Sequence, residues 1–159
     1  MKRKQLTMDS IDLRILAVVQ ADASLSQTEL AERVGISSTA CSRRVQSLVE
    51  EGIIRRRVAL LSHEKLNVGV TVFVAVRTNR HSSASLEQFQ KLLNDLPEVL
   101  EYYRIAGHVD YLIKAVVPDI AAYDTLYQRI VSRVELTEVT SMFAMQQIKE
   151  TTAIPLNYV

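Results

Sequence analysis

The sequence lacks several features that would place it in particular classes of protein. It has one cysteine, Cys41, in 159 residues, which excludes an internal disulfide and is typical of a reducing cytoplasm. No apolar run approaches the roughly 20 residues that a membrane-spanning helix needs. The basic first residues lead into Asp9 and Asp12, a pattern that argues against a signal peptide. We therefore expect a cytoplasmic protein with no membrane partner.

Net charge is also small, at +1 for the whole chain, which taken alone disfavours a nucleic-acid partner. The charges are unevenly divided, however. Residues 1–60 hold ten Lys and Arg against seven Asp and Glu, a net of +3, whereas residues 61–159 hold nine against eleven, a net of −2. The basic excess lies in the N-terminal part, as nucleic-acid binding requires. Because the excess is small, strong binding would need several copies acting together.

Motifs for catalysis and metal binding are missing as well. The sequence has no phosphate-binding loop and no nucleophile elbow. The three histidines, His63, His81 and His108, are far apart and have no Cys or acid at metal-ligand spacing. Cys41 falls on an apolar helical stripe, which favours a core position over a nucleophile. We predict no catalytic residue, no metal site and no cofactor.

The most informative stretch is residues 26–52, which predicts two helices joined by a tight turn. Ser26 and Glu29 fit the S-x-x-E capping box at the start of a helix over about 27–34. Gly35 stands where a left-handed residue would end that helix. This pattern of short helix, glycine turn and second helix is typical of a helix-turn-helix.

The second helix, over about 38–51, has one apolar and one polar face. Its polar face near the start carries hydroxyls, an amide and arginines, which can hydrogen-bond base edges in a major groove. Any surface helix has a polar face, so periodicity alone leaves both interpretations open. The predicted DNA-binding residues are Ser37, Ser38, Thr39, Ser42, Arg43, Arg44 and Gln46.

A helix is also expected over about 8–21, capped by Asp9 or Ser10. It would complete a three-helix domain at residues 1–54, in which the helix-turn-helix covers about 27–46. Residues 1–7 would form a loose basic arm. Residues 53–61 are β-branched and basic and predict a strand that leaves this domain. We expect residues 55–67 to be strand and linker between the two domains. The Arg55–Arg57 run would either contact phosphates or protect an exposed strand edge.

Residues 68–159 follow the order strand, helix, strand, strand, helix, strand, which predicts a ferredoxin-like domain with both helices on one face of an antiparallel sheet. The other face carries residues such as Phe73 or Val72 and Phe143 or Met142, and it is too apolar to remain exposed to water. We therefore expect this face to pack on a second copy of the chain, which makes a dimer the smallest unit. The expected strands are residues 68–78, 99–106, 111–117 and 137–148.

The two halves together resemble the Lrp/AsnC family of bacterial and archaeal transcriptional regulators over nearly the whole chain. The resemblance rests on DSIDLRIL from Asp9, LAERVGIS from Leu30, CSRRV from Cys41, GII from Gly52, GHVDYL from Gly107 and KETT from Lys149. It implies an α+β fold with an N-terminal three-helix, winged-helix-like helix-turn-helix domain. The C-terminal domain would be a ferredoxin-like βαββαβ domain of the RAM/ACT-like type, which binds small molecules and forms dimers that assemble further into tetramers or octamers.

The resemblance also implies an effector, usually an amino acid, bound between subunits near a Gly-x-x-Asp turn. In this chain the turn is Gly107, His108, Val109 and Asp110. Gly107 would let backbone amides approach a carboxylate, and Asp110 could pair with an ammonium group. A hairpin turn that Asp110 caps is the alternative. Several relatives carry an acid where this chain has His108, which leaves open whether the effector is leucine.

We therefore predict a sequence-specific, double-stranded-DNA-binding transcriptional regulator, and no enzyme, that responds to an amino acid or related small metabolite. A sequence-tolerant DNA-compacting protein is the first alternative, because Lys and Arg contacts to phosphates alone would give it affinity. A metabolic enzyme is the second, since ferredoxin-like domains also occur in catalysts.

Overall fold

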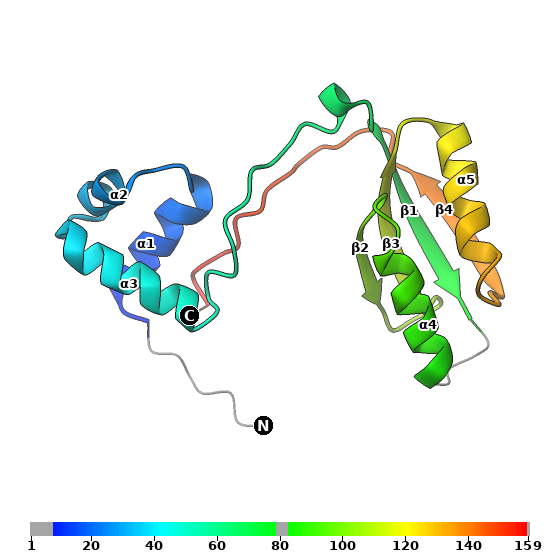
Figure 1. The fold of residues 1–159 in the computed structure, drawn as a ribbon, viewed down its shortest axis with the longest axis horizontal. Helices are drawn as coiled ribbons and strands as arrows, with labels where there is room; N and C mark the ends of the chain where they lie inside the picture. The colour runs from blue at the N-terminus through cyan, green and yellow to red at the C-terminus, as the bar shows by residue number, and fades with distance from the viewer. Residues whose placement is uncertain (1–7, 79–82, 159) are drawn as a thin grey trace. The chain divides into compact units, whose positions relative to one another are not determined.

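The computed structural model describes residues 8–78 and 83–158 and divides the chain into two compact units (Figure 1). The first unit takes in the residues up to Leu60 together with those from Lys149 onward, and the second covers Leu61–Ile148. The expected basic arm over residues 1–7 lies outside the described residues. Each unit has its own hydrophobic core, so the two are described separately below.

The first unit contains three helices, α1 (Ser10–Ala21), α2 (Gln27–Val34) and α3 (Ser38–Glu50), close to the predicted bounds. Ile15 and Cys41, both 0 % exposed, lie in a core to which all three helices contribute. This core holds α2 and α3 in the helix-turn-helix arrangement.

The helix starts are stabilised by their own sequence. Asp9 caps α1, where its Oδ1 accepts the amides of Ile11 and Asp12 at 2.9 Å. At the start of α2, the predicted capping box is confirmed: the Ser26 amide donates to Glu29 Oε2 at 2.8 Å, and the Glu29 amide donates to Ser26 Oγ at 3.3 Å. Such caps contribute about 1 kcal/mol each, because they satisfy amides that have no partner within the helix.

The strand predicted over residues 53–61 is wrong. Gly52, with φ +73°, turns the chain at the end of α3. The amides of Ile53 and Ile54 then donate to the Leu48 carbonyl at 2.9 and 3.0 Å, and both side chains pack against the helical core. These two residues therefore cap α3, and residues 53–61, all of which the structure describes, form no strand.

The end of the chain also belongs to the first unit. Gln20 on α1 hydrogen-bonds the backbone of Ile154 twice: its Oε1 accepts the Ile154 amide at 3.0 Å, and its Nε2 donates to the Ile154 carbonyl at 3.2 Å. Leu156 packs against the core of the three helices. The predicted boundaries counted these residues with the second domain.

The second unit is an antiparallel sheet with the strand order β2-β3-β1-β4, the βαββαβ ferredoxin-like fold that we expected. Its elements are the short 3-10 helix η1 (Glu64–Leu66), β1 (Val70–Arg77), α4 (Ser83–Asn94), β2 (Val99–Arg104), β3 (Tyr111–Val117), α5 (Ile120–Val131) and β4 (Glu138–Phe143). The last strand stops five residues before the predicted end. The reason is its register: Phe143 pairs with Val72, so the residues beyond Ala144 run past the start of β1.

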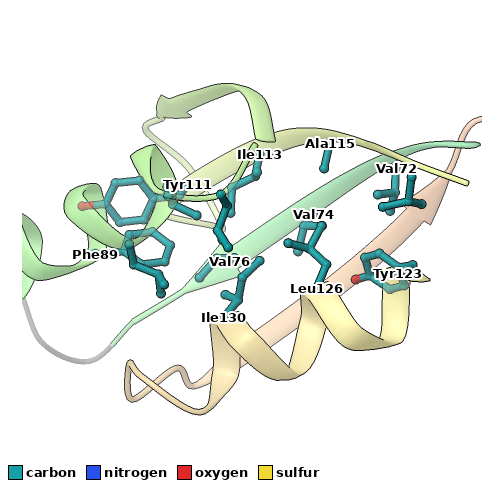
Figure 2. Packing of buried hydrophobic residues seen from close by; sticks show 14 residues of the cluster. Val72, Val74, Val76, Phe89, Tyr111, Ile113, Ala115, Tyr123, Leu126 and Ile130 are labelled. Atoms are coloured by element: carbon teal, nitrogen blue, oxygen red, sulfur yellow. The ribbon is translucent and has the colours of Figure 1, made fainter. Parts of the chain in front are cut away.

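Both helices, α4 and α5, cover the same face of this sheet (Figure 1). Val72, Val74 and Val76 alternate along β1 and are at most 1 % exposed. Figure 2 shows these valines pointing toward the side chains of α5, including Leu126 and Ile130. The period-2 pattern of β1 therefore determines which sheet face the helices cover.

The opposite sheet face carries apolar side chains with no helix over them. Phe73 on β1 stands directly opposite Met142 on β4, and Met142 is 46 % exposed. Of the alternatives left open by the sequence, Val72 and Phe143 lie on the helix-covered face, where the Phe143 ring contacts Tyr123 edge to face. No helix of the described residues is long and apolar enough to cross a membrane.

Candidate nucleic-acid interface and small-molecule site

The turn between α2 and α3 orients α3. Gly35 adopts φ +76° and its amide donates to the Ala31 carbonyl at 2.9 Å, which ends α2. Two residues later Ser37 caps α3, with its Oγ accepting the Ala40 amide at 3.3 Å. Because Cys41 and Val45 are buried against α1 and α2, the opposite side of α3 must face outward.

The outward side of α3 is where most of the predicted DNA-binding residues lie. Arg43 is exposed and forms no ion pair with another described residue. Gln46 donates from Nε2 to Glu50 Oε1 at 2.8 Å, one turn further along the helix. The exposed members of the predicted set are Ser37, Ser38, Thr39, Ser42, Arg43 and Gln46. They form a polar surface with one cation and several groups that can both donate and accept.

Arg44 differs from its neighbour Arg43. Its side chain is only 29 % exposed, and its Nη1 lies 2.8 Å from Asp9 Oδ2 and 2.8 Å from Asp12 Oδ1. The hydrogen bond from the Asp12 amide, together with the Arg44 guanidinium, holds the pKa of the Asp9 carboxyl below its usual value. Arg44 therefore connects α3 to the start of α1; helical periodicity in the sequence places Arg44 on the flank of the polar face, but it does not show the pairing with Asp9 and Asp12.

The sequence raised three other side chains as candidates for chemistry: Cys41 in the first unit, and His63 and His81 in the second. Burial raises the pKa of the Cys41 thiol, which disfavours the reactive thiolate. Within the described residues, no group of three or more His, Cys, Asp or Glu side chains is arranged to hold a metal ion. His81 lies outside the described residues, and His63 precedes η1.

The predicted effector turn joins β2 to β3 in the second unit. Gly107 has φ +144°, a conformation that few other residues adopt, and Gly107 and His108 are exposed. Val109 and Asp110 are half-buried. The four residues are thus brought together at one end of the sheet, with the amide-rich part of the turn open to solvent.

Asp110 already has a structural role in this turn. Its Oδ2 accepts the Thr78 amide at 2.8 Å, and its own amide donates to the Val76 carbonyl at 2.8 Å. The Ile105 amide donates to the Asp110 carbonyl at 3.0 Å and closes the loop. Asp110 therefore caps the end of β1, and a ligand here would share a carboxylate that holds the strand in place.

Two family models together match most of the chain. The model described as a winged helix-turn-helix DNA-binding domain matches residues 8–55, and the model described as the Lrp/AsnC ligand binding domain matches residues 71–154. Among curated proteins, the chain is 44 % identical over 149 residues to the glutamate uptake regulatory protein of Zymomonas mobilis, covering 94 % of this chain and 91 % of the relative.

Solved structures agree over the same length. An AsnC family transcriptional regulator from Agrobacterium tumefaciens is 51 % identical with a TM-score of 0.92, and the match covers 95 % of this chain and 99 % of that one. A transcriptional regulator from Neisseria meningitidis, solved as a complex with L-Met, is 35 % identical with a TM-score of 0.91, covering 96 % and 99 %.

Proposed function

The chain belongs to the Lrp/AsnC family of transcriptional regulators, whose members are not enzymes, and we propose that α3 reads a specific DNA sequence under the control of an amino acid. One observation carries the proposal: α3 presents Thr39, Ser42 and Arg43 outward, on the second helix of a helix-turn-helix. A free guanidinium on such a helix is suited to the acceptor pair O6 and N7 of guanine. The DNA partner and the free thiol of Cys41 support a cytoplasmic location.

DNA reading by this surface needs two copies. The first unit has little positive charge, so one α3 would bind weakly, and two would occupy adjacent major grooves about 34 Å apart. The uncovered sheet face with Phe73 and Met142 supports a homodimer, because an apolar face of this kind is stable only when another surface covers it. We expect such dimers to assemble further into tetramers or octamers, on the basis of the family resemblance alone.

The effector of this protein would bind at the turn from Gly107 to Asp110. Exposed backbone at Gly107 suits a carboxylate, and the Asp110 oxygen that does not hold Thr78 suits an ammonium group. The Neisseria relative solved with L-Met supports an amino acid as the chemical class. Binding must favour one assembly state over another, since a ligand with equal affinity for both would change nothing.

The test of the function compares DNA from upstream of the protein's own gene with random DNA of equal length, at about 150 mM salt because affinities depend on it. A preference of about a thousandfold or more is the expected result for a specific regulator. Equal affinity for both DNAs, lost as salt rises, would identify a DNA-compacting protein instead. Amino acids are then added one at a time, and Asp110→Ala should abolish the response to whichever one acts.

A further inference from the structure

We propose that the second unit contains a separate binding cavity for a small carboxylate, lined by residues of one chain and adjacent to the Gly107–Asp110 turn. The cavity has a volume of about 260 Å³ and lies between α4, the segment after α5 and the end of the sheet. Pockets for drug-sized ligands measure roughly 300–1,000 Å³, so the occupant would have the size of a small metabolite.

The floor of the cavity is aromatic. Phe89 on α4 and Tyr111 at the start of β3 line it, and their rings meet edge to face with centroids 5.0 Å apart (Figure 2). Both residues are only 3 % exposed, so they are fixed by the core behind them. Such a floor can receive the apolar part of a ligand without rearranging.

The rim of the cavity is polar and contains one cation, Arg133, and one carboxylate, Glu135. Arg133 lines it, and none of the described residues forms an ion pair with this guanidinium. The Arg133 carbonyl accepts a hydrogen bond from Gln88 Nε2 at 3.4 Å, which links α4 to the segment after α5 across the rim. An arginine beside a compact cavity is suited to a carboxylate, which it can bind through two parallel hydrogen bonds.

These features define the class of ligand as a small carboxylate with a short side chain. Free amino acids and the corresponding 2-oxo acids share this chemistry. Thr78 connects the cavity to the effector turn, because it lines the cavity while its amide donates to Asp110 Oδ2 at 2.8 Å. A ligand bound in this cavity would therefore affect the position of the effector turn through Thr78. This regulatory consequence rests on the proposed function, whereas binding itself does not.

The test is a titration of the full chain, labelled on Leu and Val methyl groups for NMR, without DNA. The probes are L-methionine, L-leucine, L-glutamate and their 2-oxo acids, with isopentylamine as a carboxyl-free control. We expect the methyl signals of Leu86, Val134 and Leu136, which line the cavity, to shift with one of the carboxylates and not with the amine. Comparison of each amino acid with its 2-oxo acid then shows whether the ammonium group contributes.

Two variants decide whether the cavity is the site. Arg133→Gln should weaken binding about tenfold or more, the loss expected for a charge-assisted hydrogen bond. Val134→Phe should fill the cavity and abolish binding, and thermal unfolding would confirm that it is folded. Lys91→Gln, which removes another exposed cation from the same unit, should bind as the parent chain does.

Unchanged affinity in both Arg133→Gln and Val134→Phe, or the absence of shifts at the cavity methyls with every carboxylate, would overturn the inference. The proposed function is tested separately by the DNA assay. If a ligand binds in the cavity without changing DNA affinity, the site is supported but has no regulatory role. If the response of DNA binding to an amino acid survives in Val134→Phe, that response is assigned to the turn.

Discussion

Arg43 and Arg44 are adjacent in the sequence, yet they are expected to affect DNA binding in different ways. Arg43 is exposed and unpaired among the described residues, so Arg43→Ala should cost about 1–3 kcal/mol of specific binding and relax discrimination at one base pair. Binding to a set of operators with single base-pair changes measures this. An equal loss on every sequence would show that Arg43 contacts only phosphate.

Arg44 is held by Asp9 and Asp12 and should act by positioning α3. We therefore expect Arg44→Ala to lower the thermal stability of the first unit and to weaken binding to specific and random DNA to a similar extent, with the order of base preferences unchanged. Asp12→Asn should reproduce this pattern although it removes no positive charge. If Arg44→Ala changed base preference and left stability intact, Arg44 would have to be a reading residue.

At the scale of the element, the caps of α1 and α2 make helix stability depend on pH. Hydrogen bonds from the Ser26 hydroxyl and then from the Ser26 amide hold the pKa of the Glu29 carboxyl below its usual value. Because the folded-state pKa is depressed, the contribution to stability is present above the unfolded pKa, about 4.3, and is lost as pH falls through the folded pKa.

Glu29→Gln should therefore reduce the loss of stability between about pH 5 and the folded pKa, since the substituted amide cannot be protonated in this range. Urea unfolding at a series of pH values measures the effect. Glu32→Gln is the matched control, because Glu32 is exposed on the same helix and its side chain forms no hydrogen bond with any residue that the structure describes. An identical pH dependence in both variants would contradict the capping role of Glu29.

How far the sequence predicts each element depends on whether its cause is local. The capping box at Ser26 and the left-handed Gly35 involve residues a few positions apart, so their roles could be predicted before the fold was known. Ile53 and Ile54 favour a strand by propensity, but their amides donate to the Leu48 carbonyl. This arrangement depends on packing against the helical core, which the local sequence does not show. The pairing of Arg44 with Asp9 and the cavity at Phe89 likewise depend on distant segments coming together.

For the molecule as a whole, the uncovered sheet face makes a prediction about assembly. Phe73→Glu would place a charge at the centre of this face, directly opposite Met142, and should convert a dimer into monomers in analytical ultracentrifugation. DNA affinity should also fall when the dimer dissociates, because the two copies of α3 are then no longer linked. Leu66→Glu, which changes an exposed leucine outside the sheet, is the control. A dimer that persisted in Phe73→Glu would place the subunit contact elsewhere.

The contact between α1 and the end of the chain can be tested at the same scale. Leu156 is half-buried against the helical core, so Leu156→Ala should destabilise the first unit by about 1 kcal/mol, less than the 2–5 kcal/mol of a fully buried leucine. Gln20→Ala removes both hydrogen bonds to Ile154 and should have a similar effect. Thermal unfolding of the two variants measures it, with Leu66→Ala as an exposed reference. Wild-type stability in both variants would show that the chain end contributes nothing.

The same contact has a consequence during protein synthesis. The three helices are synthesised before the second unit, but Ile154 and Leu156 follow that unit, and Ile154 lies 134 positions after the Gln20 that binds it. The domain that holds α3 therefore reaches its final form only after the whole second unit has been synthesised. A product that stops directly after the second unit, through a stop codon or a broken message, would carry the whole of α3, yet it would lack Ile154 and Leu156, which contact the helices of the first unit.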